Sequence, residues 1–271
     1  MNQQAYRTVT YPAGGSNAFA SFTGLAMHVP TDGSETDLDI YIDVAGDGFV
    51  HYGVGGVVTL LANEGFSATS GSGAVVTSAG PADLTGNTFY IRKSKPTFTK
   101  LDAGADPLNG PLYRFWVMAD NAGYIDIKQL ALKVSTAGCE VNDLYLFDPI
   151  AGVRLTDALV NPTNGVAVLP IAGFNTNDPS GFASVIVIEM YPRSLEVWGT
   201  VSGYGQAGDS ITVGFIQDAN PVANGSVLEV AGSGAFNIWS DRSASAHTVF
   251  TTDWTNRYLL EGKDQLQTFI R

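Results

Sequence analysis

The chain has 271 residues, enough to bury a substantial core either as one large domain or as two smaller ones. Its formal net charge of -12 at pH 7 would repel a phosphate backbone, so the sequence argues against nucleic acid as a partner. No run of about 18 apolar residues occurs, and a membrane-spanning helix is therefore not predicted.

The composition favours short strands joined by tight turns. Charged residues make up 15% of the chain, below the typical share of about 25%, and 31 residues are glycine. The acids are 19 Asp and 7 Glu, and Asp favours turns because its short carboxylate bonds to nearby backbone, so most of the negative charge is predicted in loops. Cys139 is the only cysteine, which excludes an intrachain disulfide.

Six segments show the alternating pattern, or the clusters of β-branched and aromatic residues, that are typical of strands. They are 38–44, 113–118, 130–134, 144–147, 166–169 and 185–190. Clusters of Gly, Asn, Asp and Pro lie between them and predict turns. No segment combines a helical spacing of apolar residues with a start cap and a stop signal. The sequence therefore predicts an all-β chain of antiparallel sheets, folded as a sandwich or a barrel.

Four aspartates in and after the first predicted strand are the candidate metal ligands: Asp37, Asp39, Asp43 and Asp47. Carboxylates crowded near a Gly-rich turn suit calcium, a cation that prefers oxygen ligands, although the spacing lacks the EF-hand pattern. The alternative is a solvated strand face, because three of the four alternate with apolar residues. That outward alternation also argues against a pair of glycosidase carboxylates. No cofactor other than calcium is predicted.

The boundary between two units is predicted near a basic cluster that interrupts the acidic chain, Arg92, Lys93 and Lys95. Pro96 follows it and pushes the preceding residue toward extended geometry, as expected of a linker strand. We therefore predict a sandwich or partial sandwich at 1–94 and a larger sandwich at 95–271. The alternative is a hairpin edge on which the lysines prevent pairing with another sheet.

A weak internal repeat supports this division. Segments 10–22 and 37–44 resemble 190–198 and 209–216, since each set has a proline-led strand, a loop and an Asp-led strand. On this alignment the first unit matches only the later half of the second, and a half-sandwich would expose an apolar face. Two explanations stay open. Either the chain is cut from a longer repeat protein, or a strand donated by a neighbouring molecule completes the first unit.

The C-terminal block, residues 236–262, contains the candidate binding and catalytic side chains. Trp239 and Trp254 lie among apolar residues, so we predict that both are in the core; stacking on sugar rings is the alternative. His247, with Asp241 and several serines nearby, invites comparison with a catalytic triad. No Gly-Xaa-Ser-Xaa-Gly elbow exposes a serine, so no catalytic residue is predicted.

A short helix at 253–260 is one interpretation of the end of this block. Asp253 would cap it, and Trp254 and Tyr258 would share a face. The same residues are equally compatible with a loop anchored by Trp254, and we favour the loop.

Two stretches resemble a known family. The first contains Ile238-Trp239-Ser240-Asp241, Ser243-Ala244-Ser245, His247 and Asp253-Trp254-Thr255-Asn256, and the second runs Arg92-Lys93-Ser94-Lys95-Pro96-Thr97. They resemble large secreted surface proteins of candidate-phyla bacteria, of the Patescibacteria and Parcubacteria type, in which such motifs recur in immunoglobulin-like repeats. Arg257 and Lys263 depart from the pattern of that family, which has Gly and Leu-Pro around these positions.

The resemblance implies tandem immunoglobulin-like β-sandwich units in a non-enzymatic, extracellular structural protein. Such a module of a surface layer (S-layer) or filament at the cell surface would assemble with copies of itself through sheet edges and loops. One alternative is a carbohydrate-binding or adhesin module, with a glycan as partner, and another is a virion tail or fibre protein. Residues 1–7 lack the pattern of a signal peptide, so an export signal would have been removed or would lie outside this sequence.

Overall fold

The computed structural model describes residues 18–25, 30, 32, 39–41, 55–62, 66–78, 82–120, 122–171, 185–187, 191–216, 222–226, 237–256 and 265–271. Every regular element in these residues is a strand, and every pairing between strands is antiparallel. The prediction of an all-β chain of antiparallel sheets is confirmed, whereas immunoglobulin-like units stay a prediction. No helix suited to crossing a membrane is found in the described residues.

The chain separates into two compact units. The first comprises Met1–Val50 and Val57–Thr88, and the second comprises His51–Gly56 and Phe89–Arg271. The segment 89–94, which we assigned to the first unit, lies in the second. Its backbone and side chains explain this placement, because the Lys93 amide donates to Asp241 and the Ser94 hydroxyl donates to the Gly123 carbonyl.

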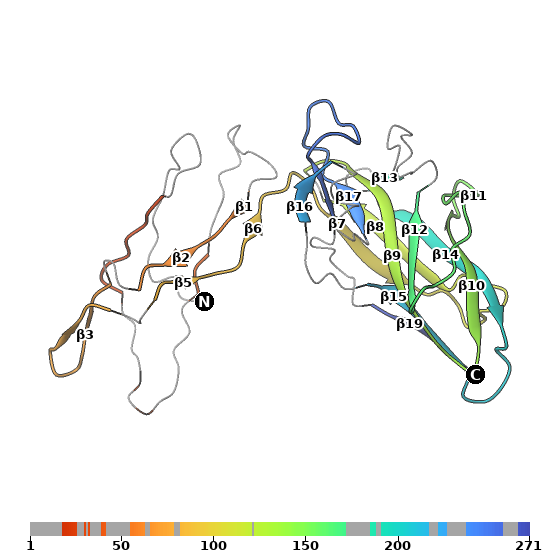
Figure 1. The fold of residues 1–271 in the computed structure, drawn as a ribbon, viewed down its shortest axis with the longest axis horizontal. Coiled ribbons are helices and arrows are strands. Elements are labelled where there is room, and N and C mark those ends of the chain that lie inside the picture. Colours follow the sequence, from red (N-terminus) through yellow and green to blue (C-terminus); the bar gives the residue numbers. More distant parts are fainter. Residues whose placement is uncertain are drawn as a thin grey trace. The chain divides into compact units, whose positions relative to one another are not determined.

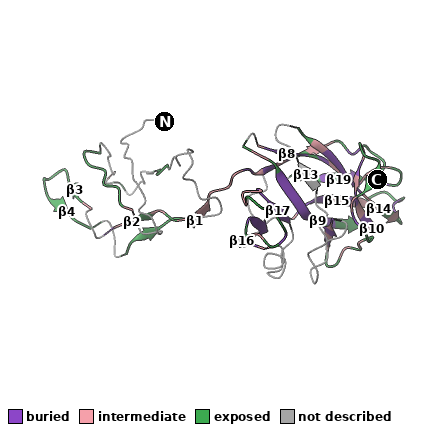
Figure 2. Ribbon diagram, turned by 90° about the horizontal axis from the view of Figure 1, so that it is seen from above, coloured by how far each residue is buried: buried purple, intermediate pink, exposed green. Residues whose placement is uncertain are grey.

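The described part of the first unit contains two short antiparallel strand pairs, together with connecting segments and residues 18–25, 30, 32 and 39–41. In one, β2 (Thr59–Leu60) pairs with β5 (Leu84–Thr85), and in the other β3 (Ala68–Thr69) pairs with β4 (Val75–Val76). Figure 2 shows exposed residues along these strands. The predicted strand at 38–44 and the repeat segment 10–22 lie mostly outside the described residues.

The second unit is built from two sheets, together with a short pairing of β1 (Gly55–Gly56) with β6 (Phe89–Tyr90) (Figure 1). The five-stranded sheet has the order β11 (Val153–Arg154), β10 (Glu140–Asp148), β14 (Arg193–Ser202), β8 (Tyr113–Ala119) and β7 (Pro96–Leu101). The eight-stranded sheet has the order β16 (Val222–Gly225), β18 (Trp254–Asn256), β17 (Ile238–Ser240), β9 (Ile125–Ala137), β15 (Ser210–Phe215) and β19 (Gln267–Ile270), with β12 (Val166–Pro170) and β13 (Val185–Val187) also paired to β9.

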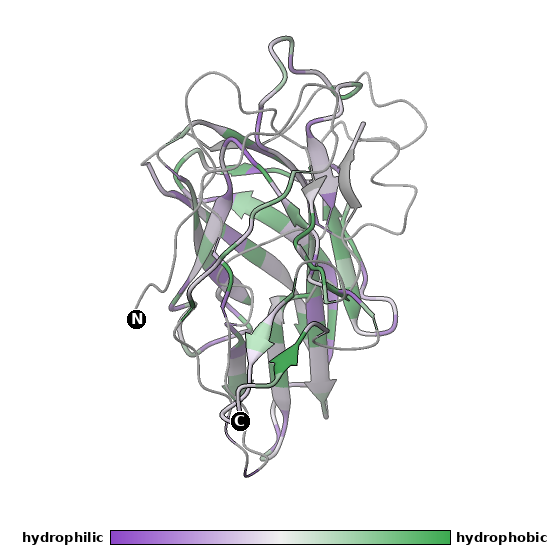
Figure 3. Cartoon of the chain, turned by 90° about the vertical axis from the view of Figure 1, so that its left-hand side faces the viewer, coloured by the Kyte–Doolittle hydropathy of each residue, from purple (hydrophilic) through white to green (hydrophobic). Residues whose placement is uncertain are grey.

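Strand β8 shows why these sequences form half-buried strands. Residues 113, 115, 117 and 119 are buried and the residues between them are not, which is the two-residue period of a strand with one face on the core. Apolar and polar segments accordingly interleave along the strands (Figure 3). The predicted strands at 113–118, 130–134, 144–147 and 166–169 are confirmed, and 185–190 is confirmed over Val185–Val187.

An aromatic cluster joins the two sheets. Phe98, Tyr113 and Phe115 come from the five-stranded sheet, and Phe215 from β15 meets them at ring-centroid distances of 4.7, 5.6 and 5.0 Å. These edge-on and tilted contacts are the arrangements that aromatic rings prefer. The shared core is what makes the second unit a two-layer sandwich.

Strand β9 is buried on both faces at its start. A bulge opposite β17 changes which side faces the core, since Ile125 and Ile127 lie in the core before it and Leu130 lies in the core after it. Asp126 and Lys128 consequently lie on the opposite side and are still 0% exposed. The C-terminal block covers that side.

Candidate functional site: a histidine buried between two aspartates

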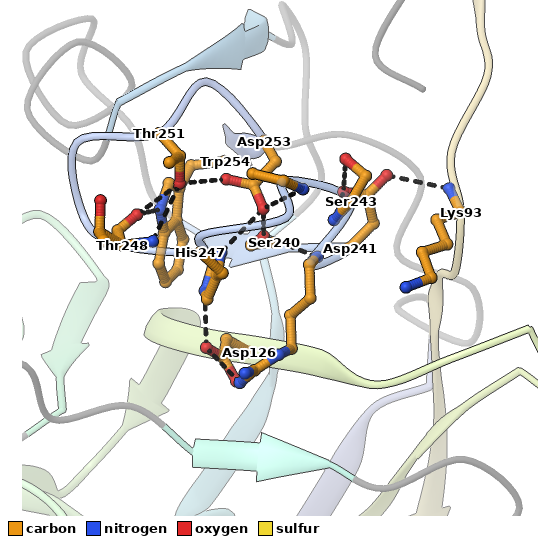
Figure 4. Close-up of polar contacts among 12 residues, drawn as sticks. Lys93, Asp126, Ser240, Asp241, Ser243, His247, Thr248, Thr251, Asp253 and Trp254 are labelled. Carbon is orange, nitrogen blue, oxygen red and sulfur yellow. Dashed lines mark hydrogen bonds and ion pairs between the residues drawn. The ribbon is translucent and has the colours of Figure 1, made fainter. Parts of the chain in front are cut away.

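Strand pairing brings the polar residues of the C-terminal block against the central strand. β17 pairs with β9, so that Ser240 lies opposite Asp126, and β18 pairs with β17, so that Trp254 lies opposite Ser240. The segment 241–253 connects β17 to β18 and folds over this point (Figure 4). Polar side chains from three strands and one connection therefore meet in one cluster.

His247 is the centre of the cluster. Its Nε2 lies 2.8 Å from Asp126 Oδ2, and its Nδ1 lies 2.8 Å from Asp253 Oδ2. The three side chains are 5%, 0% and 4% exposed. Because each ring nitrogen faces a carboxylate oxygen, both nitrogens donate and the ring is an imidazolium. Burial alone lowers the pKa of His247, but the hydrogen bonds and charges of the two aspartates outweigh it and raise the pKa to about 9.

Arg242 supplies the second positive charge. Its Nη1 lies 2.9 and 3.0 Å from the two oxygens of Asp126, and its side chain is 29% exposed. Two carboxylates, Asp126 and Asp253, thus face two cations, His247 and Arg242. The charges of the cluster cancel, which is the condition under which buried ions are tolerated.

Asp253 is held by a complete set of donors. Ser240 Oγ donates to its Oδ2 at 3.0 Å, Thr251 Oγ1 donates to its Oδ1 at 2.6 Å, and the Ala244 amide lies 3.3 Å from Oδ2. Burial raises the pKa of Asp253, whereas the bond from His247 and these donors lower it more, to about 2. Asp253 is therefore an ionised carboxylate at any ordinary pH.

Asp241 fastens the block to the entry of the second unit. Its Oδ1 accepts from the amide and hydroxyl of Ser243, at 3.2 and 2.7 Å, and its Oδ2 accepts from the Lys93 amide at 2.9 Å. The residue is 0% exposed. The carboxylate thus links two segments that lie 148 residues apart in the sequence.

Both tryptophans of the block are core residues. Trp239 is 1% exposed and Trp254 is 0% exposed, so the prediction that they lie in the core is confirmed and neither can stack on a sugar. The Trp254 indole donates to the Thr248 carbonyl at 2.8 Å, and its ring packs against the His247 ring at 5.0 Å between centroids. Neither interpretation of 253–260 holds at its start, because Trp254–Asn256 form strand β18 rather than the loop that we favoured or the alternative helix.

The geometry of the cluster does not support nucleophilic or acid–base chemistry there. Ser240 donates to Asp253 rather than to the histidine, and both nitrogens of His247 are bonded to carboxylates, so no lone pair is left to accept a serine proton. A glycosidase pair needs one protonated carboxyl, and the pKa of Asp253 is shifted the other way. The arrangement can instead hold three strands and a connection together.

The candidate calcium ligands fall mostly outside the described residues. Of the four, the structure describes Asp39, which is exposed and accepts a hydrogen bond from the Tyr41 hydroxyl at 3.5 Å. Asp37, Asp43 and Asp47 are not among the described residues. Within the described ranges no group of three or more His, Cys, Asp or Glu side chains is placed to hold a metal ion.

Sequence reasoning missed Asp126 and Arg242. Asp126 is 116 residues from Arg242 and 121 residues from His247, so no local window joins them. One signal was present in the sequence: Asp126 lies between Ile125 and Ile127, a few residues before the predicted strand at 130–134. A charge in such a setting requires a partner.

Comparisons with known proteins give no match. No protein-family model matches the chain, and neither a curated protein nor a solved structure matches it. The resemblance to bacterial surface proteins stays a prediction, and the interpretation of the cluster depends on its geometry.

Proposed function

We propose that the chain is a non-enzymatic structural module of an extracellular surface layer or filament, which assembles with copies of itself through sheet edges and loops. The observation that carries this proposal is the surface of the first unit. Many of its described apolar side chains are exposed, and assembly is one means by which such surface is covered.

The exposed fractions in the first unit are large. Phe19 is 73% exposed, Tyr41 67%, Val75 64% and Leu84 62%, whereas Ala62 is the one buried apolar side chain in the described part of this unit. An exposed apolar residue is ordinary when a core lies beneath it. Here the described strand pairs have hardly any core of their own. Each Å² of apolar surface that is covered stabilises an assembly by about 25 cal/mol. A neighbouring copy, or a strand that it donates, supplies that cover.

The second unit offers a sheet edge for extension. Strand β19 pairs with β15 and with no other strand of the described residues, and Ile270 on it is 74% exposed. Strand β7, at the edge of the other sheet, is different, because the side chain of Gln265 accepts from the Lys100 amide. An unpaired edge is a template for another chain, so β19 is the edge through which we expect copies to pair.

The buried cluster supports the same proposal. Its carboxylates are bonded to His247, Arg242 and backbone amides within the unit, so the most elaborate polar arrangement in the described residues stabilises the fold. A unit stabilised in this way suits a module that must stay folded while neighbouring copies bind to it.

The experiment compares the oligomeric state of the wild-type chain with that of Ile270→Lys. Light scattering after size exclusion and electron microscopy should show ordered particles that grow with concentration. A lysine on an edge strand opposes pairing with another sheet, so Ile270→Lys should shift assembly to higher concentration. The matched control is Phe250→Lys, which makes the same charge change at a loop residue that is 61% exposed. A wild-type chain that is a monomer at every concentration would contradict the proposal.

A further inference from the structure

The outer face of the five-stranded sheet carries an exposed tryptophan on β8, the strand next to the edge strand β7. Strand β8 points Tyr113, Phe115 and Val117 into the core, so Trp116 and Met118 point away from it. They are 44% and 39% exposed. Trp116 is thus a large aromatic surface held in place by a strand with paired neighbours on both sides, β7 and β14.

The strand register surrounds this indole with hydroxyl groups. Trp116 lies opposite Thr99 of β7 on one side and Ser194 of β14 on the other. Residues opposite each other in antiparallel strands have Cβ atoms about 4.5–5.5 Å apart. Thr99 is exposed, and Ser194, which is 6% exposed, has an Oγ without a hydrogen-bond partner in the described part of the chain. Of the two, the exposed Thr99 is the one that a ligand can reach, because the Ser194 Oγ is buried.

A neutral ion pair borders the indole along the strand. Arg114 lies two residues before Trp116 on the same face, and its Nε is 3.3 Å from Oε1 of its register partner Glu196. Glu196 also accepts from the Trp198 indole at 2.9 Å and is 8% exposed, so two donors fix it. The Arg114 side chain is 42% exposed and keeps further N–H groups for a ligand. The face combines one apolar ring with hydrogen-bonding groups and no net charge.

We propose that this face binds a neutral glycan, with one pyranose ring stacked on Trp116 and its hydroxyls bonded to Thr99 and Arg114. A pyranose has an apolar C–H face the size of an indole and a rim of hydroxyls, which matches an aromatic ring bordered by donors and acceptors. A protein partner favours a broader apolar core than one indole and one methionine. An anion would be opposed by Glu196, and a cation by Arg114. The inference goes beyond the proposed function and does not depend on it.

The test titrates the full chain with a panel of neutral oligosaccharides. The panel contains β-1,4-linked glucose, N-acetylglucosamine and mannose and α-1,4-linked glucose, and calorimetry and tryptophan fluorescence report binding. At least one sugar should bind the wild type, Trp116→Ala should weaken that binding about tenfold or more, and Trp116→Phe should weaken it less. Phe250→Ala, which removes an exposed aromatic ring from a loop next to the other sheet, should bind like the wild type.

The outcomes separate this inference from the assembly proposal. Circular dichroism and a thermal melt first establish that each variant is folded. A Trp116→Ala chain that loses the sugar and assembles like the wild type supports the glycan site. If no sugar of the panel binds the wild type, the inference is wrong. It is also wrong if a sugar binds Trp116→Ala as tightly as it binds the wild type. A Trp116→Ala chain that fails to assemble, with no sugar bound by the wild type, would make this face a protein contact instead.

Discussion

The two units of this chain handle apolar and charged side chains in opposite ways. The second unit buries Tyr113, Phe115 and Leu144 completely, whereas the described part of the first unit buries Ala62 alone among its apolar residues and exposes Phe19 and Leu84 (Figure 2). The difference indicates that the second unit is stabilised by its own core. In the described part of the first unit no comparable core is found.

Charged residues show the same contrast. In the second unit Asp126 and Asp253 are buried, because cations and backbone donors match each of them. In the first unit the described Asp39 is exposed, and its hydrogen bond from Tyr41 is solvated. Buried ions stabilise a fold only when their partners are complete, so a change inside the cluster should cost much more than a change on an exposed hairpin.

The largest effect is expected from Trp254→Ala. The side chain is 0% exposed and its indole donates to the Thr248 carbonyl, so truncation leaves a cavity and removes a buried hydrogen bond. We expect the free energy of unfolding to fall by about 3–5 kcal/mol, as for other buried aromatic residues. Chemical denaturation followed by circular dichroism measures it. Trp116→Ala is the matched control, because the same truncation at an exposed ring should cost much less. Equal losses in the two variants would remove the contrast between core and surface tryptophans.

The second effect is a dependence of stability on pH that His247 produces. The pKa is about 9 in the folded chain and 6.5 in the unfolded chain. Below pH 6.5 both states are protonated and the stabilisation is complete; between pH 6.5 and about 9 the unfolded chain has released the proton that the folded chain keeps, so stability falls. Asp253 acts at the other end, since its pKa is lowered from 3.8 to about 2 and its stabilisation is lost as the pH falls through that range.

The measurement is the melting temperature between pH 6 and 9.5 for the wild type and for His247→Gln. The melting temperature of the wild type should fall across this range. The variant should melt at a lower temperature at pH 6, but its melting temperature should change less as the pH rises. Since the other two histidines are present in both proteins, the difference isolates His247. The same slope in both proteins would show that the cluster does not hold a charged imidazole.

Much of the second unit was predictable from the sequence, because a strand with one buried face has apolar residues at every second position. The segment 113–118 has this pattern, and β8 contains it. The core positions of Trp239 and Trp254 followed from their apolar neighbours. The partners of His247 did not follow, because Asp126 comes from a distant strand and its pairing depends on the register of β9 with β17. The strand at 254–256 was missed for a related reason: it pairs with β17, and Asp253, the cap of the alternative helix, is bonded to His247, Ser240 and Thr251 instead.

The smallest effect is expected from Leu84→Ser in the first unit. This side chain is 62% exposed on β5, so in dilute solution the free energy of unfolding should change by about 0.5 kcal/mol or less. Leu195→Ser makes the identical change at a residue that is 0% exposed in the second unit, and it should cost several times more. Denaturation of both variants at low concentration, and light scattering at high concentration, separate folding from assembly. A loss at Leu84 as large as that at Leu195 would mean that the first unit has a core of its own. A small loss accompanied by weaker assembly would mean that its apolar residues serve contacts between copies.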